Sequence, residues 1–521
     1  MRHIKTPENL PQNFLFDDFE GTHWIHTLLD PSAVRCLTEG WQGVFRRSVL
    51  KLMPAKQIGE AFSPDQGRPT KEIYSMVGLL LIMEFKAWTA EEAAQAYFLD
   101  AGVQFALNLP RDRQYVSTRS VEEYRRLLRE GDDHCAEIFG KVTKALIDEL
   151  NLNIEKQRLD STHLFSNMAK LGRTQLMGTT IKRFLTQLLR HDKAAHQALP
   201  ADLLQRYAAT EGRLFGYGKA SDEEYAKRIQ QLAEDLYFLV ERFAAEPGIK
   251  QRTSYKALER VLRDHCEIHE AKGCGKSKQA IVTVKAKATD GDGQSSGVMQ
   301  NPSDPDAGYD GHKGPGYQVQ LAQSYGEENE VNLIVGCLPQ SAAQSDSDSL
   351  IALIESQAEY ELNPTKTLAD TAYGSDANVE ACLEAGIELI SPVPGGKKTS
   401  EAKQPQREDA LAEAEKSSPQ ASQMAGEAEA SKEETKAQRI AARREAEKTK
   451  AWKEEYAKRS GIEGVNSALK RVTGMKRLAV RGAKSVTLAV YLKTTGWNIL
   501  RAAFCYAQRG CKARKLAVAG G

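Results

Sequence analysis

Long hydrophobic runs are absent from this chain of 521 residues. The longest, SMVGLLLIMEF at residues 75–85, is too short to cross a bilayer and fits a buried helix. The N-terminal sequence MRHIKTPENL lacks the apolar segment of a secretory signal. We therefore expect a cytoplasmic protein with no membrane partner.

Paired cysteines are also missing. Eight cysteines stand singly along the chain with no CxxC pair, which argues against a zinc ribbon or a disulfide scaffold and favours reduced thiols. Aromatic residues make up only 7% of the chain, but 41% hydrophobic and 27% charged residues are the composition of an ordinary soluble protein. The length predicts two to four domains.

The chain as a whole has no large excess of positive or negative charge, because its formal net charge is +1. Residues 451–515 differ, because they contain fifteen Lys or Arg and only three Asp or Glu. Such a basic block favours a polyanionic partner, although basic tails also serve solubility alone.

The segment YAKRSGIEGVNSALK, residues 456–470, lies inside this basic block. Wound as an α-helix, it places Tyr456, Arg459, Glu463 and Lys470 within roughly 60° of one another, so that they form one polar stripe. Four polar side chains on one helical face predict either a solvated surface or a functional one.

Small residues occupy another side of the same helix. Gly461 and Gly464 each cost about 1 kcal/mol relative to Ala inside a helix, so we expect a close approach to another backbone as compensation. Taken alone, the polar stripe fits a solvated face with an i,i+4 ion pair between Arg459 and Glu463. Acidic partners elsewhere in the chain would favour the functional interpretation.

Residues 1–150 show the periodicity of an all-helical domain. Thr89 is expected to cap one of its helices, and Ser120 or Thr118 a later one, because acidic residues follow in the first turn. The domain is either a DNA-binding or dimerising module or a plain helical domain.

The sequence period then changes to that of strands. Residues 158–165 alternate around Asp160, and residues 317–325 and 331–338 predict a β-hairpin joined by the turn GEEN. From about residue 169 to residue 277 the pattern is helical, which predicts an insertion between these strands.

A strand, a turn, a helix and a strand follow in PTKTLADTAYGSDANVEACLEAGIELISPV. Residues 367–369 form a strand that ends at Asp370, Ser375 or Asp376 caps the helix, and Gly386 ends it. The predicted fold class is α/β: a mixed sheet with flanking helices, interrupted by a helical insertion, plus an N-terminal all-helical domain.

Residues 399–450 are rich in Ala, Glu, Lys and Ser, with no aromatic residue, which predicts a flexible or helical low-complexity spacer without a core of its own. The predicted domains are 1–150 (helical N-terminal domain), 151–168 with 301–398 and 451–505 (α/β domain), 169–300 (mainly helical insertion), 399–450 (spacer) and 506–521 (basic tail).

Three carboxylates come from different elements of this order: Asp160 from the first strand, Asp370 from the end of a later strand, and Glu463 from a terminal helix. Open α/β sheets build sites from several elements at their strand ends. Carboxylates gathered in one place repel one another unless cations compensate, and oxygen ligands select Mg²⁺ or Mn²⁺. Two such ions would support phosphodiester chemistry.

These segments resemble a known family. LDSTH around Asp160, LADTAYGS around Asp370 and the spacing Tyr-(2)-Arg-(3)-Glu-(6)-Lys in YAKRSGIEGVNSALK are similar to a bacterial insertion-sequence transposase with a DDE triad on an RNase H-like fold. DPDAGYDGHKGPGYQVQLA also resembles the second-strand region of that family, and the resemblance covers roughly residues 65–505 in order. The spacer contains no cysteine, whereas relatives often carry a Cys-rich patch before the final helix.

The resemblance implies two sets of site residues. The catalytic set, which holds two metal ions (Mg²⁺ or Mn²⁺), is Asp160, Asp370 and Glu463. The set that contacts DNA phosphates near the cleaved end is Tyr456, Arg459 and Lys470.

The activity implied by the resemblance is that of a DNA transposase. Such a protein binds the terminal inverted repeats of its element, cuts the strands and joins the 3′-hydroxyls to target DNA. A homodimer that bridges two ends, and a bacterial cytoplasmic location at the nucleoid when DNA is bound, are further implications. Two alternatives stay open: a transposase-derived DNA-binding protein that no longer cuts, and a stand-alone nuclease on the same fold.

Two other motifs are set aside. AKGCGKSKQ, residues 271–279, has Glu270 where a phosphate-binding loop requires glycine. His265 and His269, expected one helical turn apart, have no clear further ligand for a metal ion.

Overall fold

The computed structural model describes residues 2–3, 24–63, 68–109, 115–131, 133–208, 221–270, 280–285, 297–395 and 436–519. Across these ranges, no helix combines the length and apolar character needed to span a membrane. The glycine-containing motif at 271–279 and the larger part of the predicted spacer lie outside the described residues.

Helices dominate the N-terminal region. They are α1 (Ile25–Leu28), α2 (Pro31–Glu39), α3 (Trp41–Val44), α4 (Ala55–Gly59), α5 (Ile73–Phe85), α6 (Ala90–Leu99), α7 (Ala101–Ala106), α8 (Thr118–Glu130) and α9 (His134–Leu150). A π-helical turn (Phe45–Val49), a 3₁₀ turn (Leu50–Leu52) and a parallel pair of two-residue strands, β1 (Arg2–His3) and β2 (Arg68–Pro69), complete this region.

The predicted helix caps are confirmed in one case and wrong in the other. Thr89 caps α6 through a capping box with Glu92. The cap of α8 is Ser117, whose hydroxyl accepts from the backbone N–H of Ser120, so the prediction of Ser120 or Thr118 was wrong. The hydroxyl one residue before the first helical residue is better placed to reach the free N–H groups than one inside the first turn.

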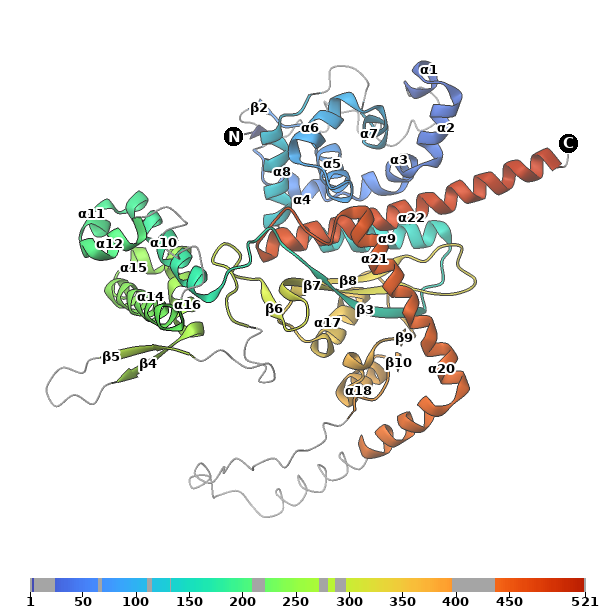
Figure 1. Cartoon of the computed structure of the whole chain (residues 1–521). Helices are drawn as coiled ribbons and strands as arrows, with labels where there is room; N and C mark the ends of the chain where they lie inside the picture. Colours follow the sequence, from blue (N-terminus) through green and yellow to red (C-terminus); the bar gives the residue numbers. More distant parts are fainter. Residues whose placement is uncertain are drawn as a thin grey trace, which may run out of the picture.

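A mixed sheet lies below these helices (Figure 1). Its strands are β3 (Lys156–Leu164), β6 (Gly308–Asp310), β7 (Gly314–Ser324), β8 (Ile334–Ser341), β9 (Lys366–Leu368) and β10 (Glu388–Ile390). The order is β10-β9-β3-β7-β6, and β8 also pairs with β7. β9 is parallel to both β10 and β3, whereas β7 is antiparallel to β3, β6 and β8.

The predicted hairpin is confirmed as the pair β7 and β8, with β7 beginning three residues earlier and β8 three residues later than expected. The mixed α/β class with a helical N-terminal region is likewise confirmed.

Helices cover both faces of the sheet. α22 (Ala483–Ala519) lies between the sheet and the N-terminal helices and contacts α5, α9 and β8 (Figure 1). α17 (Asp346–Ala358) packs on the other side, against β7 and β8, and α18 (Asp376–Glu384) packs beside it. Ser375 caps α18, and Gly386 follows it with a φ of +73°, as the sequence predicted.

The insertion comprises α10 (Arg173–His191), α11 (Lys193–Gln197), α12 (Ala201–Ala208), α14 (Asp222–Phe243), α15 (Pro247–Lys250), α16 (Thr253–His265), β4 (Cys266–Glu270) and β5 (Ala280–Val284). The expectation that His265 and His269 lie one helical turn apart was wrong. The helix ends at His265, because Cys266 starts a strand that pairs with β5, and Cys266 and Val282 are buried against the helices.

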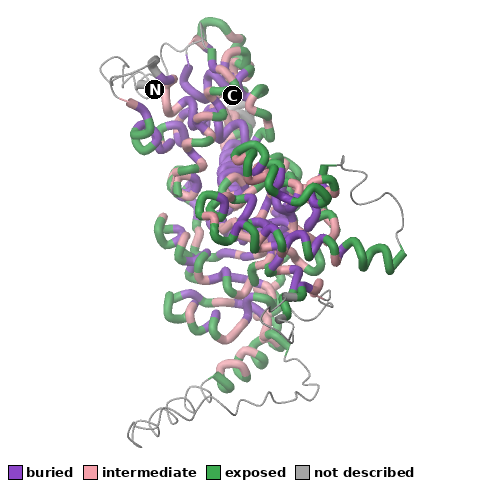
Figure 2. The backbone as a smooth tube through the Cα atoms, turned by 90° about the vertical axis from the view of Figure 1, so that its left-hand side faces the viewer, coloured by how far each residue is buried: buried purple, intermediate pink, exposed green. Residues whose placement is uncertain are grey.

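Buried side chains among the described residues form three hydrophobic clusters. The first runs from the N-terminal helices into the sheet and α22, and the second lies wholly within the insertion. The third is small: Tyr325, Leu368 and Ile390, with Trp452 and Tyr456 packed against them. Figure 2 shows this burial along the backbone, with the exposed positions at the outer surfaces of the helices.

The C-terminal end of the predicted spacer is attached to the sheet domain. Residues 436–448 are helical. Arg439 forms an ion pair of 2.7 Å with the buried carboxylate of Asp376, and Arg443 donates to the carbonyls of Gly374 and Ser391. This helix therefore packs beside the segment that follows Asp370.

Candidate active site

Asp160 lies in the middle of β3, between β9 and β7, opposite Leu321. Its side chain is 18% exposed. Burial raises its pKa to about 6, Arg459 opposes that rise, and the neighbouring carboxylates of Asp370 and Glu463 add to it. All three predicted carboxylates are therefore near enough to affect the charge of Asp160.

The register of the sheet explains why Asp370 lies at the level of Asp160. Arg158 of β3 is the partner of Leu368, the last residue of the parallel strand β9, and each aspartate stands two residues further along the chain. Asp370 caps the 3₁₀ turn (Thr371–Tyr373) that follows the strand, and its carboxylate accepts from the backbone N–H of Ala372 at 2.9 Å.

Glu463 lies in the first turn of α21 (Gly461–Thr473). The expected uninterrupted helix is divided into α20 (Lys450–Ala457), a 3₁₀ turn (Lys458–Ser460) and α21. The Glu463 side chain is 61% exposed, so its carboxylate projects from the sheet toward solvent.

Arg459 is the cation between the acids. Its guanidinium lies 3.6 Å from the carboxylate of Asp160 and 3.1 Å from that of Glu463. The i,i+4 pair expected for a solvated face is present, but the Arg459 side chain is only 17% exposed because it also faces Asp160. Arg459 thus links the helix to the central strand.

Gly461 permits the approach of this helix to the sheet. A Cβ at this position would lie 1.8 Å from the guanidinium of Arg158, which donates to the carbonyl of Lys458 and to the side chain of Gln323. The expected close approach is therefore present at Gly461, but to a side chain rather than to a backbone. Around Gly464 the space is open, so the expectation was wrong there.

Tyr456 and Lys470 lie at the two ends of the polar stripe. Tyr456 is half-buried and stacks on Trp452, with ring centroids 4.8 Å apart. Lys470 is half-buried, and burial together with the nearby cations Lys313 and Lys476 lowers its pKa. This end of the stripe is electropositive, while the centre carries the carboxylates.

Asn466 is a site residue that the sequence analysis missed. Its amide donates to the carboxylate of Asp160 at 3.0 Å, and its buried Oδ1 has no hydrogen-bond partner within the described part of the chain. Its position three residues after Glu463, on the same helical face, is the signal that would have identified it.

A second missed residue holds β3 from the opposite side. Asp346 accepts from the Ser161 hydroxyl at 2.9 Å and from the Gln320 amide at 2.7 Å. Gln320 in turn accepts from the buried Tyr373 hydroxyl. This network connects β3, β7 and the turn after Asp370, but no sequence pattern predicts it.

The donor set fits a hard cation, since it consists of carboxylate oxygens and the unpaired Asn466 Oδ1. The carboxylates do not lie close enough together to form a preformed metal site. Among the described residues, no three His, Cys, Asp or Glu side chains form a group that could hold a metal ion. Arg459 supplies the positive charge instead.

Residues 285–499 match the family model described as "Transposase DDE domain". This range contains every predicted site residue except Asp160, which precedes it. No curated protein and no solved structure matches the chain in the corresponding comparisons. The predicted resemblance to DDE transposases is confirmed at the level of this family. The similarity to the transposase DDE domain therefore covers residues 285–499 of the 521-residue chain.

Proposed function

We propose that the protein is the DNA transposase of an insertion sequence, which binds terminal inverted repeats and performs metal-dependent strand cleavage and strand transfer. The observation that carries the proposal is the position of Asp160 on β3, where burial and then the carboxylates of Asp370 and Glu463, from two other elements, raise its pKa. Residues 285–499, which contain Asp370 and Glu463, match the transposase DDE domain. The mixed sheet with β3 in its interior supports an RNase H-like catalytic domain.

In this proposal Asp160, Asp370 and Glu463 hold two Mg²⁺ or Mn²⁺ ions. When bound, these ions activate a water or a 3′-hydroxyl and stabilise the leaving oxygen of the phosphodiester. Asn466 orients the Asp160 carboxylate through its amide. Burial is the main cause of the raised pKa of Asp160, and the carboxylates of Asp370 and Glu463 add to it, so a bound cation would favour the charged form.

The DNA backbone is proposed to follow the polar stripe. Lys470 presents an ammonium beside Lys313 and Lys476, where a phosphate would relieve the repulsion among the three cations. Arg459 contacts two carboxylates, and its planar guanidinium would be available for a bidentate phosphate contact once those carboxylates held a cation. Tyr456 provides a hydroxyl at the other end of the stripe.

The domain boundaries given above are proposed as functional units, with residues 1–150 as a DNA-binding or dimerising module. A homodimer that bridges two transposon ends, and a cytoplasmic location at the nucleoid, belong to the same proposal.

Strand cleavage tests the proposal. A labelled duplex that carries the terminal repeat of the element is incubated with protein in Mg²⁺ or Ca²⁺, and both binding and cutting are measured. We expect cutting only in Mg²⁺, and we expect Asp160→Ala, Asp370→Ala and Glu463→Ala to abolish it while end binding persists. Glu454→Ala is the matched control, because Glu454 is an exposed carboxylate on α20.

Each contrary outcome identifies a different error. Cutting by any one of the three variants removes that residue from the triad. Binding without cutting by the wild type indicates a DNA-binding protein that no longer cleaves. Cutting without preference for the terminal repeat, and without joining, indicates a stand-alone nuclease.

A further inference from the structure

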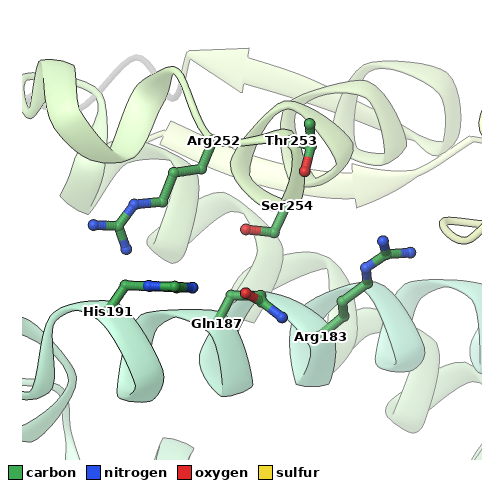
Figure 3. Close-up of a pocket in the computed structure, with 6 residues that line it drawn as sticks. All are labelled: Arg183, Gln187, His191, Arg252, Thr253 and Ser254. Atoms are coloured by element: carbon green, nitrogen blue, oxygen red, sulfur yellow. The ribbon is translucent and has the colours of Figure 1, made fainter. Parts of the chain in front are cut away.

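A cavity of about 610 Å³ lies within the insertion, between α10 and the N-terminus of α16 (Figure 3). Its lining residues are Arg183, Gln187, His191, Arg252, Thr253 and Ser254. They include two arginines and a histidine but no carboxylate, so the cavity suits an anion.

Arg252 presents an unsatisfied donor here. Its Nε donates to the carbonyl of Gly248 at 3.2 Å, whereas its buried Nη1 has no hydrogen-bond partner in the part of the chain that the structure describes. Arg183 stands at the other end of the cavity (Figure 3), where its Nη1 is held by the carbonyl of Pro302. A buried guanidinium nitrogen without a partner is costly, so a ligand that accepts from it is favoured.

Ser254 provides an independent observation. Its side chain points into the cavity (Figure 3), although the residue is only 5% exposed, and its hydroxyl makes no hydrogen bond to any described residue. The hydroxyl oxygen is open to the cavity, so it can donate a hydrogen bond to an acceptor that enters there.

The backbone at the N-terminus of α16 also favours an anion in this cavity. α16 is 13 residues long, and no side chain caps its N-terminus. The N–H groups of Thr253 and Ser254, at its first two positions, belong to the set that has no partner within a helix, and the positive end of the helix dipole favours an anion beside them. Such termini are ready-made phosphate sites.

We propose that this cavity binds a phosphate group of the DNA backbone, so that the insertion holds the duplex away from the carboxylate site. This proposal rests on the proposed function, because that function makes DNA the ligand. Two arginines stand at opposite ends of the cavity (Figure 3), which favours a backbone segment over a single free phosphate.

The chain connection keeps the cavity within reach of a duplex bound at the carboxylates. Arg183 follows Asp160 by 23 positions, of which the last ten are helical. Fully extended, the first part spans at most about 45 Å and the helical part about 15 Å. At about 3.4 Å per base pair, this limit of about 60 Å corresponds to about 18 base pairs.

The test is equilibrium binding of a labelled random-sequence duplex of about 40 base pairs, measured by fluorescence anisotropy over a range of NaCl concentrations. The variants are Arg252→Gln and Ser254→Ala. Lys256→Gln is the control, since Lys256 is exposed on the same helix and does not line the cavity. Thermal midpoints measured by circular dichroism establish that each variant is folded.

We expect Arg252→Gln to weaken duplex binding about tenfold and to reduce the slope of log K against log salt by about 0.9, as for one lost phosphate contact. Ser254→Ala is expected to weaken binding several-fold without a change in slope, whereas Lys256→Gln binds as the wild type does. Wild-type affinity in both Arg252→Gln and Ser254→Ala overturns the proposal.

A second arm distinguishes DNA from free phosphate. Inorganic phosphate that raises the thermal midpoint of the wild type but not of Arg252→Gln, together with unchanged duplex binding, assigns the cavity to free phosphate and overturns the DNA proposal. Cleavage is measured on the same preparations. Loss of duplex binding in the variants without Mg²⁺-dependent cleavage by the wild type refutes the proposed function but supports the phosphate cavity.

Discussion

Replacement of Asp160 by Asn should stabilise the metal-free protein at neutral pH. The carboxyl is held in a half-buried position on β3, where burial and the nearby acids Asp370 and Glu463 raise its pKa from 3.8 to about 6 despite the guanidinium of Arg459. Asn keeps the size of the side chain and accepts the hydrogen bond from Asn466, but it carries no charge.

The size of the effect follows from the pKa difference. A change of about two pKa units, at about 1.4 kcal/mol each, makes the charged form of Asp160 about 3 kcal/mol less favourable in the folded than in the unfolded protein. Because the folded pKa is the higher one, the folded state binds more protons between pH 4 and pH 6, and wild-type stability falls as pH rises through this window. Asp160→Asn removes this loss.

Urea unfolding in EDTA at pH 4 and pH 7 measures the effect. Relative to the wild type, Asp160→Asn should gain about 2.5 kcal/mol in the free energy of unfolding between the two pH values, because the unfolded carboxyl is already partly ionised at pH 4. Asp376→Asn is the control of opposite sign. The ion pair with Arg439 lowers the pKa of Asp376, so this variant should lose stability at pH 7 relative to low pH. A gain for Asp160→Asn that does not change with pH would refute the reasoning.

Two further predictions concern packing and are measured by urea unfolding. Gly461→Ala should destabilise the fold by about 1 to 3 kcal/mol, because its Cβ meets the guanidinium of Arg158. Gly464→Ala, whose Cβ enters open space, should stabilise the fold by about 1 kcal/mol. Equal effects of the two substitutions would contradict the packing described. Lys493→Met should cost about 3 kcal/mol, because the buried ammonium lies 3.6 Å from the Glu84 carboxylate and donates to the carbonyl of the same residue. A second change, Glu84→Gln, should restore only a small part of that loss, because Glu84 also forms an ion pair of 2.8 Å with Arg125. A double variant whose loss equals the sum of the two single losses would exclude the Lys493–Glu84 pair as the cause.

Local patterns predicted the elements that carry the site. The alternation around Asp160 gave the strand β3, and the turn GEEN gave the hairpin of β7 and β8, because period and turn chemistry are properties of short segments. The register between β3 and β9, which sets Asp370 level with Asp160, depends on pairing across more than two hundred residues and left no local pattern.

Contacts between distant segments account for what was missed. The ion pair of Arg439 with Asp376 attaches the end of the predicted spacer, whereas the composition of that segment predicted only that it has no core of its own. The cavity around Arg252 and Ser254 likewise depends on the position of α16 against α10. In both cases the residue that completes the contact lies on another element, so neither segment carries a local sequence pattern that would predict the contact.

Backbone cleavage by bound Fe²⁺ tests most directly the claim that the three carboxylates hold metal ions together. Fe²⁺ replaces Mg²⁺, ascorbate and peroxide generate radicals at the bound ion, and mass spectrometry locates the cuts. The account predicts cuts beside Asp160, Asp370 and Glu463, suppressed by excess Mg²⁺ and lost together in Glu463→Gln. Cuts beside only one of the three, or a pattern unchanged in Glu463→Gln, would contradict it.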